Sequence, residues 1–185
     1  YNKDAAEKLR GLGFTVGVVA PMQGIFRGNS AVVLLGEGEI NDLVLNNNFA
    51  QHLSFTKGGA AFGRDEGYPN SLMGSIALIR QTFLDAKWYA EAQANYAKAP
   101  AGQKRPEMNE ALAALGPFSA GRQPIIFEVE DELNALRAAK IAKEFGLQMI
   151  VRGSGKEYRR LEAVKAAGLP IILPVNFPEA PSVAT

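Results

Sequence analysis

The hydrophobic pattern of this chain repeats a unit in which a helical stretch, a glycine and a short apolar run follow one another. The signature Lys-x-x-Gly-Leu ends the helical stretch at residues 8–12, 143–147 and 165–169. A glycine just past a helix can adopt the left-handed conformation that caps it, and a lysine in the last turn faces the negative end of the helix dipole. Short runs that favour buried strands come next, at residues 14–19, 149–151 and 171–173. This repetition predicts an α/β fold with parallel strands.

The pattern is clearest in the last third of the chain. It predicts strands at residues 124–129, 147–152 and 170–173, with helices at residues 131–145 and 156–167 between them. The strands start at residues 124, 147 and 170, so the spacing is 23 residues each time. Such equal and compact βα units favour the wall of a barrel over an open sheet. A complete eight-unit barrel takes about 250 residues, so these 185 residues predict an incomplete TIM-like (β/α)8 barrel.

The first half of the chain is less regular. We expect a helix at residues 3–10, strands at residues 14–20 and 31–35, and a loop between the strands at residues 21–30. We expect residues 37–67 to form an irregular segment that leaves the barrel wall. Within it, residues 42–45 and 52–55 are expected to form a small hairpin around Asn46, Asn47 and Asn48. Asparagine suits such a turn because it tolerates positive φ angles. The glycine-rich end, residues 57–67, predicts a mobile segment.

A long amphipathic helix is expected after Pro69, with Asn70 or Ser71 as its N-cap. Its apolar positions alternate by four and three and form one stripe, which we interpret as core packing: Leu72, Ile76, Ile79, Phe83, Ala86 and Ala90. Residues 99–105 break this helix. A shorter helix is predicted at residues 107–115, ending at Gly116 and Pro117.

Composition narrows the function classes. Hydrophobic residues make up 47% and charged residues 21% of the chain, which is ordinary for a soluble globular domain. The net charge of +1 gives no strong field, so we expect neither nucleic acid nor a membrane as a partner. The lack of cysteine excludes disulfides, thiolate metal sites and cysteine nucleophiles. No apolar run reaches the roughly 18 residues that a membrane-spanning helix needs.

We expect residues 1–185 to form a single domain, because this length suffices for one hydrophobic core and is short for two. The chain opens with Tyr1, not methionine, immediately before a predicted helix, so we expect a piece cut from a longer protein. No signal peptide is visible, and the cellular location cannot be read from these residues.

Two groups of residues are candidates for a site. Arg27, Gly28 and Ser30 belong to the predicted loop at residues 24–30, where backbone N–H groups and the arginine could cradle an anion. A purely structural turn explains the same glycines. The single histidine, His52, is expected to have a structural or surface role, because one histidine cannot build a zinc site.

Glu128 and Arg152 form the second group. Each lies at the C-terminal end of a predicted buried strand, and the two strands are consecutive. In α/β barrels the chemistry is placed at the C-terminal ends of the strands. Two neighbouring charges there are costly unless they are paired, although both could instead lie beyond the strand ends in solvent.

Several stretches resemble the metal-dependent amidohydrolase superfamily, in particular its imidazolonepropionase-like branch. They are residues 17–31, residues 68–89, which are the most specific, and a tail made of residues 124–129, 136–146 and 169–174. The resemblance implies a (β/α)8 barrel that hydrolyses C–N bonds in cyclic or linear amides. It also implies one or two divalent metal ions, such as zinc, at the C-terminal ends of the strands.

The metal ligands of that family are not matched here. The family has His-x-His on the first strand, a carboxylated lysine or a glutamate on the fourth, histidines on the fifth and sixth, and an aspartate on the eighth. This chain has Glu128 in the register of the fifth-strand histidine and Arg152 in that of the sixth. We therefore assign no metal to this chain and expect zinc only in the parent protein. We also expect Glu128 and Arg152 to form an ion pair in the space of the lost metal cluster.

The leading interpretation is the central fragment of an amidohydrolase that acts on a small-molecule amide, the fragment being inactive alone because hydrolysis needs a metal-activated water. The alternative is a non-catalytic ligand-binding or scaffold domain paired with an active barrel. A third hypothesis is an enzyme in which Arg27 and Arg152 grip an anionic substrate without a metal. An incomplete barrel would expose unpaired strand edges, so we expect the fragment to self-associate.

Overall fold

A computed structural model describes residues 2–57 and 67–174 and shows a six-stranded sheet. The strands are β1 (Val16–Val19), β2 (Phe26–Leu34), β3 (Val44–Ser54), β4 (Ile125–Glu128), β5 (Met149–Arg152) and β6 (Ile171–Ile172). They lie in the sheet in the order in which they occur in the chain. The pairs β1–β2 and β2–β3 are antiparallel, whereas β3–β4, β4–β5 and β5–β6 are parallel.

Six α-helices and a 3-10 helix accompany the sheet in the described part of the chain. They are α1 (Lys3–Gly11), α2 (Ile40–Leu43), α3 (Leu72–Lys98), α4 (Glu110–Ser119), α5 (Glu132–Phe145), η1 (Glu157–Arg160) and α6 (Leu161–Ala167). Over residues 2–57 and 67–174, no helix combines the length and apolar character needed to cross a membrane.

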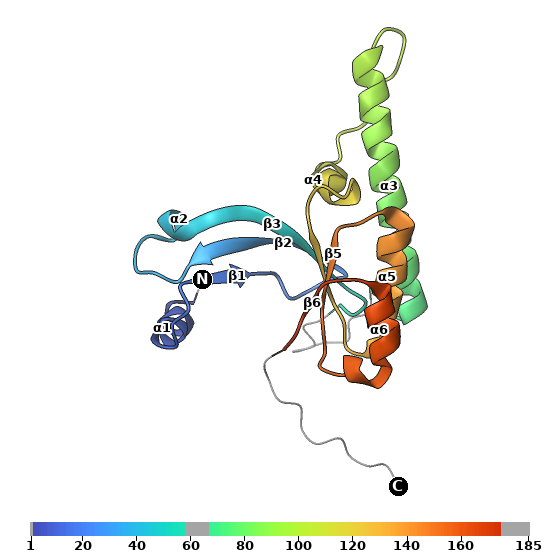
Figure 1. The fold of residues 1–185 in the computed structure, drawn as a ribbon. Coiled ribbons are helices and arrows are strands. Elements are labelled where there is room, and N and C mark those ends of the chain that lie inside the picture. The colour runs from blue at the N-terminus through green and yellow to red at the C-terminus, as the bar shows by residue number, and fades with distance from the viewer. Residues whose placement is uncertain (1, 58–66, 175–185) are drawn as a thin grey trace.

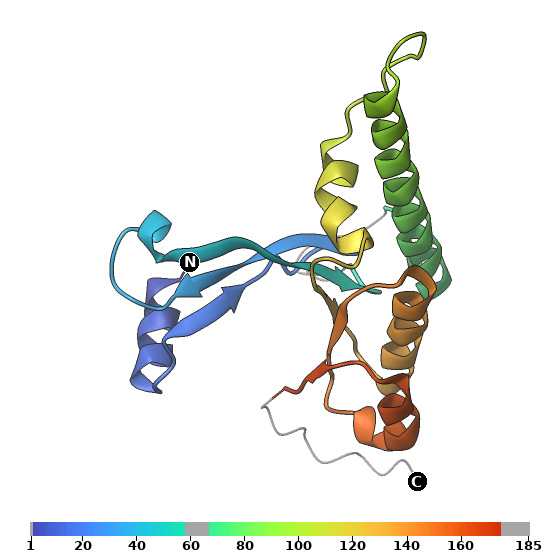
Figure 2. The ribbon, with the colours of Figure 1, turned by 45° about the horizontal axis from the view of Figure 1, so that its top comes forward.

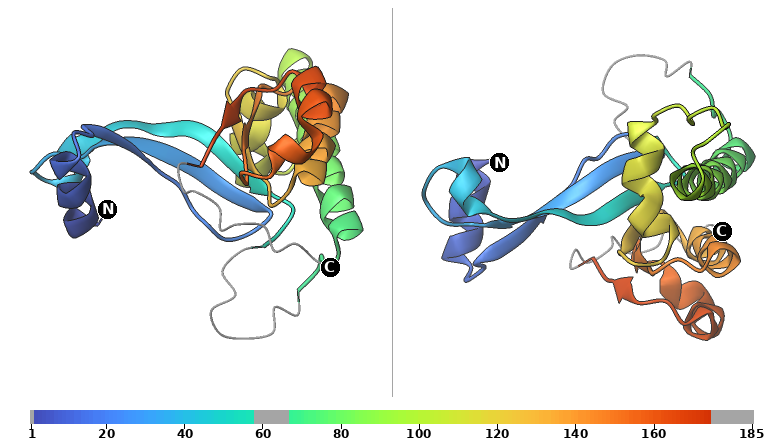
Figure 3. Two further views of the ribbon diagram at one scale, coloured as in Figure 1. Left: turned by 60° about the horizontal axis from the view of Figure 1, so that its bottom comes forward. Right: turned by 90° about the horizontal axis from the view of Figure 1, so that it is seen from above.

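The elements form two differently built parts. Strands β2 and β3 make a long twisted ribbon that carries α1, β1 and α2 away from the larger helices (Figure 1). Figure 2 shows the same ribbon reaching sideways from the layer formed by α3, α5 and α6. Seen from above, in the right panel of Figure 3, the helices gather at one end of the ribbon and α1 lies at the other. The parallel strands and their helices therefore form one wall of a curved barrel.

The core lies between the parallel strands and the helices. Leu53, Phe127 and Val151 are neighbours in the register of β3, β4 and β5, and all three are buried. They belong to one hydrophobic cluster with residues of α3 and α5, among them Ile79, Phe83, Ala138 and Ile141. Since strand side chains alternate between faces, His52, Glu128 and Arg152 lie on the other face, which is the interior of the barrel wall. The predicted class, an incomplete TIM-like α/β barrel, is confirmed.

The first repeat unit does not form a buried parallel strand, so that prediction is wrong. β1 pairs antiparallel with β2, and three of its four residues are exposed. Only residues 20–25 connect the two strands, whereas a parallel crossover needs a dozen residues or more. The expected left-handed caps are confirmed at Gly146 (φ 66°) and Gly168 (φ 70°). In α1 the cap is instead Leu12 in a right-handed conformation.

The predicted hairpin around Asn46, Asn47 and Asn48 is also wrong. These residues lie inside β3, an uninterrupted strand of 11 residues. Pairing with β2 outweighs their turn preference, and the Nδ2 atom of Asn29 donates a hydrogen bond to Oδ1 of Asn48 at 2.7 Å. The segment predicted to be mobile, residues 57–67, falls largely outside the described residues.

The loop expected at residues 21–30 is shorter than predicted, because β2 begins at Phe26. The Phe26 ring packs edge-on against Phe83 of α3, with ring centroids 5.6 Å apart. This contact anchors the beginning of the strand to the helical layer. As a result Arg27, Gly28 and Ser30 are strand residues.

The long helix begins as predicted, with Ser71 as N-cap and its Oγ accepting a hydrogen bond from the backbone N–H of Gly74 at 3.1 Å. The central part of the predicted stripe is buried, namely Ile79, Phe83 and Ala86, while both of its ends are exposed. The shorter helix continues past its predicted end and includes Pro117. Burial of Leu115 and Phe118 against the core explains why the helix runs on.

The edge of β1 is exposed, and its three valines are between 43% and 51% accessible. Such an edge offers unpaired backbone groups to another strand. Self-association stays a prediction.

Two glycines of similar conformation allow a matched test of the packing between α4 and α5. Gly121 has a φ of 65°, and a Cβ there would lie 2.7 Å from the carbonyl oxygen of Gly146. Gly146 has a φ of 66° but open space around its own Cβ position. We expect Gly146→Ala to lower the free energy of unfolding by about 1–2 kcal/mol, through left-handed strain alone. Gly121→Ala should cost about 1 kcal/mol more because of the clash. Equal losses in urea unfolding would contradict the close approach.

Candidate functional site

The candidate site is the row of side chains at the C-terminal ends of the parallel strands. Ser54, Glu128, Arg152 and Ile172 are partners in the register of β3, β4, β5 and β6. The strands bring these four residues to one edge of the sheet, on the face that points away from the helices. In barrels of this architecture that edge is where substrates are bound.

The Glu128 carboxylate is the centre of the row. Its Oε2 atom accepts a hydrogen bond from Nη1 of Arg152 and forms an ion pair with Nη1 of Arg27 at 2.9 Å. The predicted ion pair between Glu128 and Arg152 is therefore confirmed. The ion pair between Arg27 and Glu128 was not predicted; only the third hypothesis placed Arg27 and Arg152 at one site.

The three side chains differ sharply in exposure. The Arg27 side chain is 3% accessible, that of Glu128 27% and that of Arg152 49%. The cluster is thus a buried guanidinium below, a carboxylate in the middle and a half-exposed guanidinium at the rim. A buried charge requires a partner, and for Arg27 that partner is Glu128.

A β-bulge explains how Arg27 reaches β4 across an intervening strand. Phe26 is opposite Leu53, but Gly28 is opposite His52, so the register shifts at Arg27. Bulges re-aim a side chain, and this one directs Arg27 over β3 toward Glu128. The φ of Gly28 is 102°, a conformation that side chains with a Cβ rarely adopt. Nε of Arg27 also donates to the carbonyl of Gly24 at 3.3 Å, which fixes the guanidinium.

The other two predicted ligand-binding residues have structural positions. Gly28 supplies the backbone conformation of the bulge. Ser30 is fully buried in β2, and its Oγ donates to the carbonyl of Ala50 at 3.2 Å. The hydroxyl of Ser30 therefore ties β2 to β3 and does not face a binding surface.

His52 lies in the middle of the cluster, which sequence reasoning missed. Its Nε2 atom is buried and has no hydrogen-bond partner among the described residues. Burial lowers the pKa of His52 below its usual 6.5; the charges of Arg27 and Arg152 also lower it, while Glu128 raises it. The imidazole is therefore neutral at physiological pH. The alternation of polar His52 and Ser54 with buried Leu53 is the signal that would have placed both on the interior face.

Further polar contacts fix the rim. The Thr56 hydroxyl donates to Oε1 of Glu130 at 3.0 Å, and Lys156 Nζ approaches the Glu130 carbonyl at 3.4 Å. Beyond β5, the buried Glu157 carboxylate accepts from the backbone N–H groups of Ser154 and Gly155 at 2.6 and 2.9 Å. Glu157 thereby holds the turn that follows Arg152 in one conformation.

The donor set at these strand ends does not fit a divalent metal ion. Over residues 2–57 and 67–174, no three His, Cys, Asp or Glu side chains come together as a metal site would require. The one carboxylate in the ion cluster is already paired with two guanidinium groups, and these positive charges would repel a divalent cation. The chemistry of Arg27, Glu128 and Arg152 favours an anion at this place.

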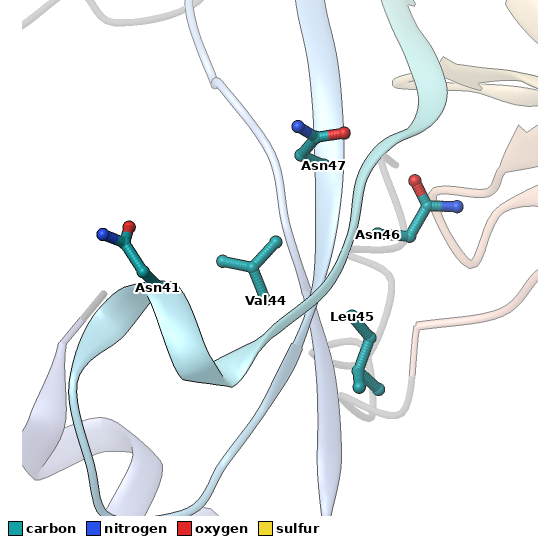
Figure 4. Close-up of a pocket in the computed structure, with 5 residues that line it drawn as sticks. All are labelled: Asn41, Val44, Leu45, Asn46 and Asn47. Carbon is teal, nitrogen blue, oxygen red and sulfur yellow. The ribbon is translucent and has the colours of Figure 1, made fainter.

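The surface has two other hollows of interest. One is lined by Asn41, Val44, Leu45, Asn46 and Asn47 near α2, and its amide groups point in different directions (Figure 4). It has no charged side chain in its lining, so we assign no chemistry to it. The other lies near the strand ends, between the first turns of α3 and α5, and includes Thr56, Ser71, Glu130 and Asn134.

The depressed pKa of His52 predicts a pH dependence of stability. The unfolded chain takes up the proton near pH 6.5, whereas the folded chain binds it only at lower pH. Protonation below pH 6.5 therefore favours the unfolded state, and the free energy of unfolding should fall as the pH drops through this range. NMR titration of the His52 ring, assigned with His52→Gln, should give a pKa below 6.5, and the variant should lose this part of the pH dependence. A ring that titrates at or above 6.5 would contradict the buried, cation-flanked position.

Comparison with known proteins supports the fold. No family model and no curated protein matches the chain. The crystal structure of an amidohydrolase from Thermotoga maritima MSB8 is similar to it, with a TM-score of 0.80 at 17% sequence identity. The match covers 95% of this chain and 46% of that protein, so the chain spans less than half of its length. The chain thus has the fold of a part of an amidohydrolase.

Proposed function

We propose that this chain forms the central wall of an amidohydrolase-type barrel, of the imidazolonepropionase-like branch, that hydrolyses C–N bonds in small amides. The observation that supports this most is the position of Glu128 and Arg152. Both lie at the C-terminal ends of adjacent parallel strands and on the interior face. That is the location of substrate-contacting residues in enzymes of this architecture. The similar Thermotoga maritima structure is itself that of an amidohydrolase.

In this proposal the residues of the chain bind and orient the substrate. Arg152 offers a half-exposed guanidinium at the rim, and Glu128 holds that group in place. The activated water that hydrolysis requires would come from elements outside this chain, because the donor set at its strand ends does not fit a metal ion. The 185-residue chain alone should therefore be inactive.

A second candidate function is a non-catalytic domain that binds an anionic ligand or packs beside an active barrel. Two guanidinium groups, those of Arg27 and Arg152, lie at the strand ends, where barrels of this architecture bind their substrates. This positive charge favours the binding of an anionic ligand. The two functions differ in whether the complete protein turns over an amide. They do not differ in whether the strand-end arginine contacts a ligand.

The test is an assay of the complete protein against a panel of cyclic and linear amides, followed by Arg152→Gln. We expect hydrolysis of at least one compound and a loss of kcat/KM of about tenfold or more in the variant, since a hydrogen bond to a charged group contributes about 1.5–3 kcal/mol. Arg80→Gln is the matched control. The Arg80 side chain is 44% accessible and forms an ion pair at 2.8 Å with Glu144, which lies in the last turn of α5.

Arg80→Gln should leave the activity unchanged. No hydrolysis of any amide by the complete protein would contradict the enzymatic function and favour the binding domain. Equal activity of Arg152→Gln and the unmodified protein would show that the rim arginine does not contact the substrate.

A further inference from the structure

Strand β1 forms one end of the sheet, and in the described part of the chain its outer edge has no neighbouring strand. It lies beside β2 in the ribbon, away from the helical layer (Figure 2). The backbone N–H of Leu35 donates to the carbonyl of Thr15 at 2.9 Å. Because residues of an antiparallel pair alternate between hydrogen-bonded and non-hydrogen-bonded positions, Gly17 also bonds to β2. Val16 and Val18 therefore direct their N–H and C=O groups to the outer edge.

The free segment of this edge has a defined length. Before it, the N–H of Phe14 already donates to the carbonyl of Leu9 at 3.1 Å, at the end of α1. After it, Pro21 has no N–H to offer. The residues between these two limits are available for pairing, and Gly17 lies at their centre.

The other edges of the sheet are less suited to pairing. β6 has only two residues, and Pro170 and Pro174, which lack an N–H, lie just before and after it. Along the ribbon, β3 also has an outer edge, but side chains already bind its backbone. The N–H of Asn48 donates to Oδ1 of Asn46 at 2.9 Å, and the carbonyl of Asn48 accepts from Nε2 of Gln123 at 3.5 Å. Among the described residues, β1 therefore offers the most open edge.

The outer edge of β1 carries no charge. Residues 11–26 include no Lys, Arg, His, Asp or Glu. Edge strands are usually protected from pairing by charged side chains, prolines or bulges, and β1 has none of these. In an isologous contact the residues at the two-fold axis meet their own copies, so a charge there would face a like charge. The neutral edge therefore favours a second copy of the chain as the partner of β1.

We propose that β1 is a dimerisation edge, which pairs antiparallel with β1 of a second copy around a two-fold axis at Gly17. This register places Val16 opposite Val18 of the second copy, and each of the two symmetry-related pairs exchanges two hydrogen bonds. The exposed valines of the two copies then form cross-strand contacts. Gly17 meets its own copy at a non-hydrogen-bonded position, where strands approach most closely, and it has no side chain to obstruct the approach. The dimer edge does not depend on the proposed enzymatic function.

The first experiment measures the dissociation constant of the complete protein by light scattering over a range of concentrations. We expect a dimer that Val18→Pro weakens by about tenfold or more, because proline removes the outward N–H of each copy but no hydrogen bond to β2. Val18→Thr, which keeps the N–H and the branched side chain, is the matched control and should dimerise nearly as well as the unmodified protein.

The second experiment locates the axis by disulfide formation under mild oxidation. Residues opposite one another at a non-hydrogen-bonded position have Cα atoms about 4.5 Å apart, which is within reach of a disulfide. Gly17→Cys should therefore form a dimer linked through position 17, identified by mass spectrometry, with only the flexible end of Leu35 in the way at 3.3 Å. Leu12→Cys, at a position that is 75% accessible but distant from the axis, should not form this link.

A complete protein that is monomeric at every concentration would overturn the proposal, and protection of the β1 amides from hydrogen exchange in that monomer would show that another part of the protein covers the edge. A dimer that withstands Val18→Pro and gives no disulfide at position 17 would place the interface elsewhere and overturn it too. Circular dichroism establishes that each variant is folded, and the Gly17→Cys disulfide decides if Val18→Pro is not. A monomer that hydrolyses amides would remove the dimer edge alone, whereas a β1-linked dimer without hydrolysis would remove the enzymatic function alone.

Discussion

The carboxylate of Glu128 is held between two guanidinium groups that reach it from different depths of the barrel wall. Arg27 comes from β2, two strands away, and its charge is almost completely enclosed. A charge in that position is tolerated only with a partner, so the β-bulge at Gly28, the path of Arg27 over β3 and the place of Glu128 on β4 depend on one another. His52 lies beside this bulge, opposite Gly28 in the register, where burial and the charge of Arg27 lower its pKa. The geometry of the rim follows from this constraint.

The same constraint connects the two parts of the fold. The parallel strands are stabilised by helices on one face, where Leu53, Phe127 and Val151 join the residues of α3 and α5. Within residues 2–57 and 67–174, no comparable layer of helices covers the antiparallel ribbon, and β1 at its far end is largely exposed. At its near end the ribbon is joined to the parallel strands by the Phe26–Phe83 contact on the helical face and by the Arg27–Glu128 ion pair on the interior face. The edge at the C-terminal strand ends is therefore built jointly by both parts.

Local rules predicted the parallel half of the chain well. Apolar runs of four to six residues, helix caps at Gly146 and Gly168, and a 23-residue spacing are properties of short segments, and the sequence displays them directly, although the run at residues 170–173 forms only the two-residue β6 and is not buried. The pairing of Glu128 and Arg152 followed, because consecutive parallel strands end at one edge. The antiparallel half was predicted poorly. Its three asparagines favour a turn locally, but long-range pairing with β2 keeps them in a strand.

Arg27 shows most clearly what sequence could not supply. It is about one hundred residues from Glu128 along the chain, and its direction is set by a bulge that only the pairing of β2 with β3 reveals. Gly28 indicates an unusual backbone conformation. It does not indicate that a β-bulge there would direct the side chain of Arg27 toward Glu128. Because one histidine cannot build a zinc site, the sequence predicts only a structural or surface role for His52. The pKa of His52 depends on the charges of Arg27, Glu128 and Arg152, which come from three other strands.

The most direct test of this account is a double-mutant cycle between Arg27 and Glu128, using Arg27→Met and Glu128→Gln, with the free energy of unfolding as the measured quantity. The exposed pair Arg80 and Glu144, changed in the same way, is the reference. A coupling energy of at least about 1 kcal/mol is predicted for Arg27 and Glu128, and at most about 0.5 kcal/mol for the reference pair. Additive effects of Arg27→Met and Glu128→Gln would contradict the ion cluster on which the site and its proposed ligand depend.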